Sequence, residues 1–159
     1  RLSLVGSEMC IRDSLKEAYT YLTELPQMNR SEYPEVSYGV IEGTVCGVMG
    51  VVPSASENTI STCSRLTSDT LNAEIRNLPV FDGYVSVKHT GCIATEIENN
   101  TSQELVWKAA FMGQYPQVKV DGKLYQTESC QDVYGNVYSM VEVKLPSGKK
   151  MYAQVSDEK

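Results

Sequence analysis

Leu105-Val-Trp-Lys-Ala-Ala-Phe-Met112 is the stretch of sequence that decides the fold. Its apolar side chains recur at every second position, and the charged Lys108 falls between two of them. The alternating apolar residues are Leu105, Trp107, Ala109 and Phe111. A period of two residues is typical of a β-strand that has one buried face. We therefore expect a strand here, with Trp107 buried in the core beside the other three residues.

The same period continues on both sides of this stretch. It appears in residues 84–89, 93–98, 137–145 and 151–155. Asp121-Gly122 stands between two short apolar runs, and this dipeptide is a strong signal for a two-residue β-hairpin. Short strands separated by turns predict an antiparallel β-sandwich or partial barrel over residues 79–159.

The residues before Pro79 favour helices. The apolar residues of 15–25 fall on one helical stripe, which ends at Pro26. Ser54-Ala-Ser-Glu57 resembles a capping box, and the apolar residues that follow it are spaced mostly by threes and fours. This spacing predicts a helix from Glu57 to Leu78. The predicted fold class is α+β, with N-terminal helices in residues 15–78 packed as one domain with the β region.

Residues 36–52 leave two alternatives open. Gly39, Gly43 and Gly47 recur at every fourth residue, which is a pattern of close helix contacts. The many valines of this segment favour a strand instead. In both cases we interpret it as a buried element of the core, because it is too short and too interrupted for a membrane span.

Residues 4–14 look foreign to the rest of the chain. Leu4-Val-Gly-Ser-Glu-Met-Cys-Ile-Arg-Asp-Ser14 resembles the translation of a transposon-type sequencing adapter, codon by codon. We expect residues 1–14 to be a disordered artefact that adds nothing to the core. The chain would then come from a metagenomic or draft-assembly reading frame whose natural N-terminus is missing.

The charge of the chain excludes one class of partner. The formal net charge is −6, and the lysines and arginines are scattered along the sequence. Nucleic-acid-binding proteins usually carry a basic stripe. We expect no nucleic-acid partner.

An even number of cysteines remains once Cys10 of the adapter is removed, namely Cys46, Cys63, Cys92 and Cys130. They form no C-x-x-C pair, which argues against a zinc site, and they fit two disulfides in an oxidising compartment. If disulfides form, the shortest loops pair Cys46 with Cys63 and Cys92 with Cys130. Four thiols in a cytosolic core are the alternative.

Three asparagines lie in sequons for N-glycosylation: Asn29, Asn99 and Asn100. Together with the cysteines, they predict a secreted or cell-surface protein.

His89 is the only histidine, and it stands three residues before Cys92. A nucleophilic thiol needs a base within hydrogen-bond reach, but residues three apart on a strand point to opposite faces. We therefore interpret His89 as a structural residue. Glu96 and Glu98 share one strand face, which we interpret as an exposed acidic surface rather than a cation site. Because no catalytic motif is present, the sequence predicts a protein that is not an enzyme and has no metal and no cofactor.

The tyrosines are the most suggestive residues for binding. Strand alternation turns Tyr138 and Tyr152 outward, and the turn Pro146-Ser-Gly148 predicts that their two strands are neighbours. Both rings would then belong to one exposed face, for which Tyr125 and Tyr134 are further candidates. Exposed tyrosines serve sugar stacking, lipid anchoring or protein contacts. Tyrosine is also a common residue of half-exposed strands, which is the alternative.

A family resemblance rests on three stretches of the β region, which are Ile93-Ala-Thr-Glu-Ile-Glu-Asn-Asn-Thr-Ser102, Leu105-Val-Trp107 and Phe111-Met-Gly113. They resemble the strand-turn-strand of actinoporin-like cytolysins, and aegerolysins share a similar opening. Residues 135–157 look like a later hairpin of the same sandwich. The resemblance implies a membrane-binding β-sandwich. No lipid-binding residue can be carried over, because the chain stops near Asp157, before the headgroup-binding region of those toxins.

Two functions are therefore expected. The first is a non-catalytic, secreted binding module of the cytolysin type that docks on a lipid headgroup or a glycan. The second is a structural or protein-interaction domain of a virion or cell surface. A homo-oligomer fits either of them.

Overall fold

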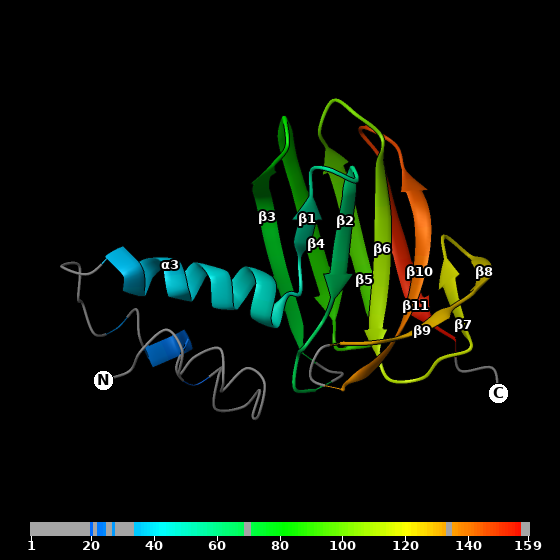
Figure 1. The fold of residues 1–159 in the computed structure, drawn as a ribbon, viewed down its shortest axis with the longest axis horizontal. Helices are drawn as coiled ribbons and strands as arrows, with labels where there is room; N and C mark the ends of the chain where they lie inside the picture. The colour runs from blue at the N-terminus through cyan, green and yellow to red at the C-terminus, as the bar shows by residue number, and fades with distance from the viewer. Residues whose placement is uncertain are drawn as a thin grey trace.

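In the computed structural model, two β-sheets pack face to face in a β-sandwich (Figure 1). The structure describes residues 20, 22–24, 27, 34–68, 71–132 and 135–156. Sheet A contains, in order across the sheet, β1 (Val52–Ser54), β2 (Thr59–Cys63), β6 (Leu105–Met112), β10 (Val137–Leu145) and β9 (Glu128–Gln131). Sheet B contains β3 (Asn72–Val80), β4 (Gly83–Thr90), β5 (Ala94–Asn100), β11 (Lys150–Val155), β7 (Gln117–Val120) and β8 (Lys123–Gln126). The predicted β-sandwich is confirmed.

The pairing of strands is antiparallel except at one place. β2 and β6 run parallel in the middle of sheet A. The chain leaves β2, builds β3, β4 and β5 of sheet B, and then returns to sheet A beside β2. Sheet A is therefore mixed, and not purely antiparallel as the sequence predicts.

The core lies between the two sheets and confirms the period of two residues. Trp107 is 0 % exposed, and its indole Nε1 donates a hydrogen bond to Thr62 Oγ1 at 2.9 Å. The other members of the predicted stripe are also buried, namely Leu105, Ala109 and Phe111. Sheet B contributes Val85, Val87 and Ile97 to the same core.

The predicted helix from Glu57 to Leu78 is wrong. Residues 55–58 form a turn, and β2 and β3 follow it. β2 has the sequence Thr-Ile-Ser-Thr-Cys, in which β-branched residues favour a strand. In β3 a bulge lies between Ile75 and Leu78, so two half-buried residues stand three apart, as they would on a helix. The sandwich therefore begins at Val52 and not at residue 79.

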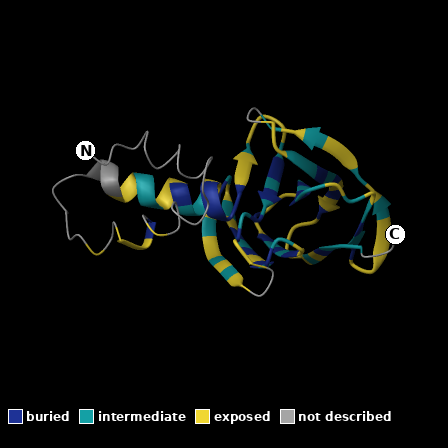
Figure 2. Cartoon of the chain, turned by 90° about the horizontal axis from the view of Figure 1, so that it is seen from below, coloured by how far each residue is buried: buried dark blue, intermediate teal, exposed yellow. Residues whose placement is uncertain are grey.

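The interpretation of residues 36–52 as a buried element of the core is wrong before Gly43, because Tyr38 and Ile41 are exposed. Of the two alternatives for this segment, the structure has a helix, α3 (Pro34–Glu42). It continues into the π-helix η2 (Gly43–Val48), and the chain becomes a strand only at Val52. Gly50 makes the change of direction with a φ of +57°. Figure 2 shows α3 extending away from the sandwich.

The earlier N-terminal region is described only in part. Residues 20 and 22–24 are helical, and Leu22 packs with Val48 of η2 and with Leu66. The rest of the helix predicted over 15–25 and all of residues 1–14 lie outside the described residues. No helix in the described part of the chain has the length and apolar character needed to cross a membrane.

The connection from β10 to β11 passes from one sheet to the other. Asn99, near the end of β5, forms hydrogen bonds with this connection. Its Nδ2 donates to the carbonyl oxygens of Gln103 and Leu145, at 2.9 and 3.0 Å. Its backbone also bonds to Gly148 and Lys149 of the connection. Residues 146–149 are therefore an arch between the sheets and not a hairpin within one sheet.

Candidate binding face

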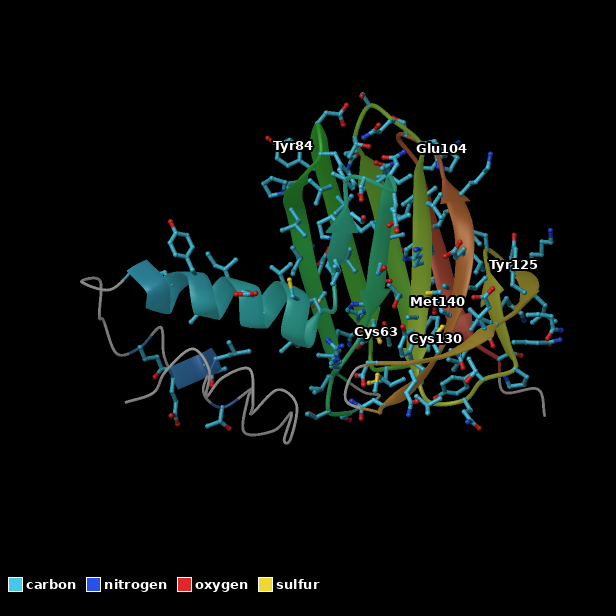
Figure 3. All side chains as sticks on the ribbon, viewed as in Figure 1. Cys63, Tyr84, Glu104, Tyr125, Cys130 and Met140 are labelled. Atoms are coloured by element: carbon cyan, nitrogen blue, oxygen red, sulfur yellow. The ribbon has the colours of Figure 1, made fainter. Side chains whose placement is uncertain are left out.

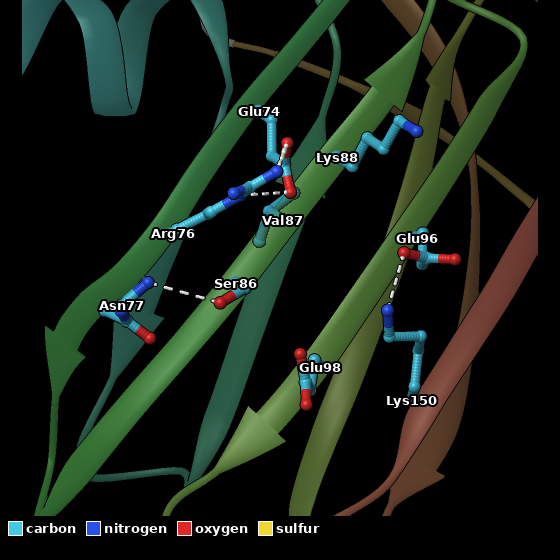
Figure 4. Close-up of a pocket in the computed structure, with 9 residues that line it drawn as sticks. All are labelled: Glu74, Arg76, Asn77, Ser86, Val87, Lys88, Glu96, Glu98 and Lys150. Atoms are coloured by element: carbon cyan, nitrogen blue, oxygen red, sulfur yellow. Dashed lines mark hydrogen bonds and ion pairs between the residues drawn. The ribbon is translucent and has the colours of Figure 1, made fainter.

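The outer face of sheet B carries a hollow of about 330 Å³ over β3, β4, β5 and β11 (Figure 4). Six charged side chains line it, namely Glu74, Arg76, Lys88, Glu96, Glu98 and Lys150. We call this surface the polar face.

Strand alternation explains why these residues gather there. Val85 and Val87 of β4 point into the core, so Ser86 and Lys88 point outward. Cross-strand pairing then places Lys88 between Glu74 and Glu96 in one row. In the next row, Glu98 lies between Ser86 and Lys150.

Two ion pairs lie on opposite sides of the hollow, one within β3 and one between β5 and β11. Arg76 binds the carboxylate of Glu74 with two nitrogens, at 2.8 and 2.9 Å. These hydrogen bonds hold the pKa of Glu74 below its ordinary value. Lys150 Nζ lies 3.1 Å from Glu96 Oε1, and this contact raises the pKa of Lys150. Arg76 and Lys150 are largely exposed and both carboxylates are partly exposed, so solvent screens the two pairs, and they arrange the surface more than they stabilise the fold.

Lys88 and Glu98 differ from the other charges of the polar face. Within the described residues, neither of them lies within 4.0 Å of an oppositely charged group. They occupy diagonal positions on the adjacent strands β4 and β5. Figure 4 shows their side chains without an ion pair between them. Both charges are therefore available to a ligand.

Two exposed tyrosines flank the hollow. Tyr152 of β11 is 41 % exposed and pairs across the sheet with Glu96. Tyr84 of β4 is 50 % exposed and pairs with Asn100. Ideal strand spacing separates these two positions by roughly 17 Å. Tyr84 was missed from sequence, because alternation turned it outward but only the pairing of strands places it on the face of Tyr152.

The prediction that Tyr138 and Tyr152 share a face is wrong. Tyr138 belongs to sheet A and Tyr152 to sheet B, since the arch after β10 crosses between the sheets. Tyr138 is half-buried next to its strand partner Cys130, and burial raises the pKa of its phenol.

The two further candidate tyrosines do not join Tyr152 either. Tyr125 is half-buried against the core, with Lys123 Nζ 5.1 Å from its ring centre. Figure 3 shows it on the side of the sandwich far from Tyr84. Tyr134 lies outside the described residues.

No disulfide joins the four described cysteines, so the two disulfides that fit the cysteine count, Cys46–Cys63 and Cys92–Cys130, are not present in the structure. Neighbours along the chain belong to different parts of the fold: Cys46 is exposed on η2 and Cys63 ends β2. Cys92 lies in the turn after β4, in sheet B, where its thiol donates to Leu66 O at 2.9 Å. Cys130 lies in β9 of sheet A. Burial raises the pKa of Cys63 to about 11, which keeps its thiol protonated at neutral pH.

The structure separates the three candidate glycosylation sites. Asn99 is completely buried, and both hydrogens of its side-chain nitrogen are donated to carbonyl groups. A glycan on that nitrogen is incompatible with the fold, which corrects the prediction for this residue. Asn100 is exposed and stays a candidate. Asn29 lies outside the described residues.

His89 is a buried residue of the core. Its Nε2 lies 2.9 Å from the carbonyl oxygen of Met49, and its Nδ1 lies 2.8 Å from Thr95 Oγ1. A carbonyl only accepts, so Nε2 carries the proton and Nδ1 accepts from the Thr95 hydroxyl. Burial lowers the pKa of His89. The interpretation of His89 as structural is confirmed.

The described residues contain no group of three or more His, Cys, Asp or Glu side chains arranged to hold a metal ion. Glu96, one half of the acidic pair considered for a cation, is bound to Lys150 instead. Comparison with protein-family models, with curated proteins and with solved structures gave no significant match.

Proposed function

We propose that this protein is a non-catalytic binding module that docks on a glycan through the polar face. The observation that carries the proposal is the polar lining of the hollow, together with two exposed tyrosines on the same face of sheet B. Tyr152 pairs across the sheet with Glu96 of the lining, and Tyr84 lies two residues before Ser86 of the lining on β4. A sugar ring presents an apolar face for an aromatic ring and a rim of hydroxyl groups for polar side chains. A site that offers both kinds of group fits this class of ligand.

The composition of the polar face favours a glycan over a lipid. A lipid-docking surface needs apolar side chains that enter the acyl boundary, whereas this hollow is lined mainly by charges. That the protein is a cytolysin, as the sequence resemblance implies, stays a prediction. Lipid binding is measured as an alternative outcome of the binding test.

The hydrogen bonds of His89 support the proposal that the module is not catalytic. Catalysis by His89 would require this imidazole to meet a thiol or a carboxylate, such as that of Cys92, in a cleft. Its two ring nitrogens are instead bonded to Met49 and Thr95 inside the core. A secreted or cell-surface location suits a glycan-binding module, although the cysteines no longer support it.

The test is binding of the purified chain to immobilised oligosaccharides and to phosphatidylcholine and phosphatidylserine vesicles. We expect oligosaccharide binding that weakens about tenfold in Tyr152→Ala and in Tyr84→Ala, which corresponds to about 1.4 kcal/mol for each ring. Tyr38→Ala is the matched control, because Tyr38 is 69 % exposed on α3, away from the polar face.

Three outcomes would contradict the proposal. Vesicle binding without oligosaccharide binding would favour a lipid-docking module. Binding of neither surface would favour the structural or protein-interaction domain. An equal loss of affinity in Tyr38→Ala would show that the effect does not belong to the polar face.

A further inference from the structure

We infer that the polar face selects a neutral, polyhydroxylated ligand, and that Lys88 and Glu98 together hydrogen-bond its neighbouring hydroxyl groups. This inference rests on the proposed function, and it adds the chemical class of the glycan and the two residues that recognise it.

The charges that line the hollow balance one another, which favours a neutral ligand. Three carboxylates and three basic groups line it, so the formal charge of the lining sums to zero. An anionic ligand that approaches Lys88 would meet Glu74 and Glu96 on the neighbouring strands. A cationic ligand that approaches Glu98 would meet Lys150 beside it. Like charges at such positions disfavour binding, and a neutral ligand avoids both conflicts.

The positions of Lys88 and Glu98 suit hydrogen bonds to adjacent hydroxyl groups of one ligand. Lys88 and Glu98 are diagonal neighbours on adjacent strands, where side chains start about 7 to 8 Å apart. An ammonium group only donates hydrogen bonds, and a carboxylate only accepts them. A hydroxyl group does both. Adjacent hydroxyls of one sugar ring can therefore accept from Lys88 and donate to Glu98 in the same complex.

The outer face of sheet A has a different arrangement of charges along its central strands. On the outer face of sheet A, the charged residues of β6 and β10 all lie in ion pairs. Lys108 contacts Glu57 and Glu142 at 3.3 and 3.5 Å, and Lys144 contacts Glu104 at 3.3 Å. The polar face also keeps Glu74 and Glu96 occupied by Arg76 and Lys150. Lys88 and Glu98 are the charges that this arrangement leaves for a ligand.

Affinity electrophoresis of the full chain tests the inference. The gels contain a neutral polysaccharide (galactomannan or β-glucan), an acidic one (polygalacturonate or heparin) or a basic one (glycol chitosan). We expect retardation by a neutral polysaccharide only, and little loss of binding in 0.5 M salt. Glu98→Gln and Lys88→Met should each weaken neutral binding at least about tenfold. Glu104→Gln and Lys144→Met, which disrupt the ion pair on the opposite face, should bind like the wild type.

The outcomes separate this inference from the proposed function. Preference for the acidic or the basic polysaccharide would overturn the inference while leaving a glycan-binding module. Wild-type binding by Glu98→Gln and Lys88→Met, together with a loss of affinity in Tyr152→Ala, would also overturn the inference and leave the glycan-binding module. Absence of binding to every polysaccharide in the set would overturn both.

Discussion

At the scale of single residues, His89 joins the helical segment to sheet B. It lies in β4, and its two partners are Met49 at the end of η2 and Thr95 in β5. A histidine in this position must be neutral, because neither partner offers a negative charge and burial disfavours the imidazolium form.

Stability should therefore fall as the pH falls through the ordinary range of histidine. Because burial lowers the pKa of His89 in the folded state, the unfolded chain takes up a proton first, below about pH 6.5. The free energy of unfolding should decrease from that pH down to the pKa of the folded state, with a slope of at most about 1.4 kcal/mol per pH unit. Urea denaturation followed by Trp107 fluorescence between pH 8 and 5 measures this slope. His89→Gln should flatten it, and an unchanged slope in that variant would contradict the assignment.

Asn99 is a second residue on which several segments depend. Its side-chain oxygen accepts from the backbone nitrogen and the hydroxyl of Thr101, at 2.9 and 2.7 Å. Its nitrogen donates to the carbonyl oxygens of Gln103 and Leu145.

Asn99→Ala should destabilise the fold by about 3 kcal/mol, because it leaves several buried polar groups without a hydrogen bond. The neighbouring Asn100→Ala is the control, since Asn100 is exposed and its loss should change the free energy of unfolding by less than about 0.5 kcal/mol. Urea denaturation of both variants provides the comparison. Equal stability of the two would show that the arch does not depend on Asn99.

At the scale of elements, the end of the helical segment depends on the close approach of Gly50 to β2. Cys63 N donates to Gly50 O at 3.2 Å, and a Cβ on residue 50 would lie 2.1 Å from Cys63 O. The positive φ of Gly50 is also unfavourable for any residue with a side chain.

Gly50→Ala should cost roughly 3 kcal/mol or more, because strain of the backbone adds to a clash with β2. Gly122→Ala is the matched control: this glycine also has a positive φ, of +82°, but open space surrounds it. The control should cost only about 1 kcal/mol. Thermal unfolding of the two variants tests the difference, and a Gly50→Ala protein as stable as the Gly122→Ala protein would contradict it.

At the scale of the whole molecule, the two lateral edges of the sandwich are built differently. On one edge, β8 of sheet B runs into β9 of sheet A through Thr127 alone, so the chain itself joins the sheets. On the other edge, β1 and β3 are the outermost strands of the two sheets among the described residues. β1 contains Pro53, and β3 contains Pro79 and the bulge. Proline and bulges protect sheet edges against pairing with other chains.

The sandwich is held by its core and by these connections, without a covalent link between the described cysteines. A reducing agent should therefore leave the free energy of unfolding unchanged, whereas a native disulfide would contribute about 2 to 4 kcal/mol. Urea denaturation with and without dithiothreitol measures this. A loss of 2 kcal/mol or more in the reductant would show that a disulfide forms in solution.

The sequence by itself determined most strands of the β region, though not β9, and which side chains of those strands face the core. The alternation around Trp107 was sufficient, because a strand turns successive side chains to opposite faces whatever its partner is. It also determined that Glu96 and Glu98 share one exposed strand face. The spacing of apolar residues wrongly predicted a helix over β2 and β3. In β3 the bulge places half-buried residues three apart, as in a helix, and before β2 the sequence resembles a capping box.

Only the tertiary structure decided which outward-facing residues meet. The arch held by Asn99 sends β11 into sheet B, which separates Tyr152 from Tyr138 and brings it to the face of Tyr84. The pairing of β4 with β5 likewise sets Lys88 beside Glu98. These are contacts between segments far apart in the chain, and local periodicity contains no information about which strand a given strand will pair with. The polar face, and the function proposed for it, is therefore a property of the folded sheet.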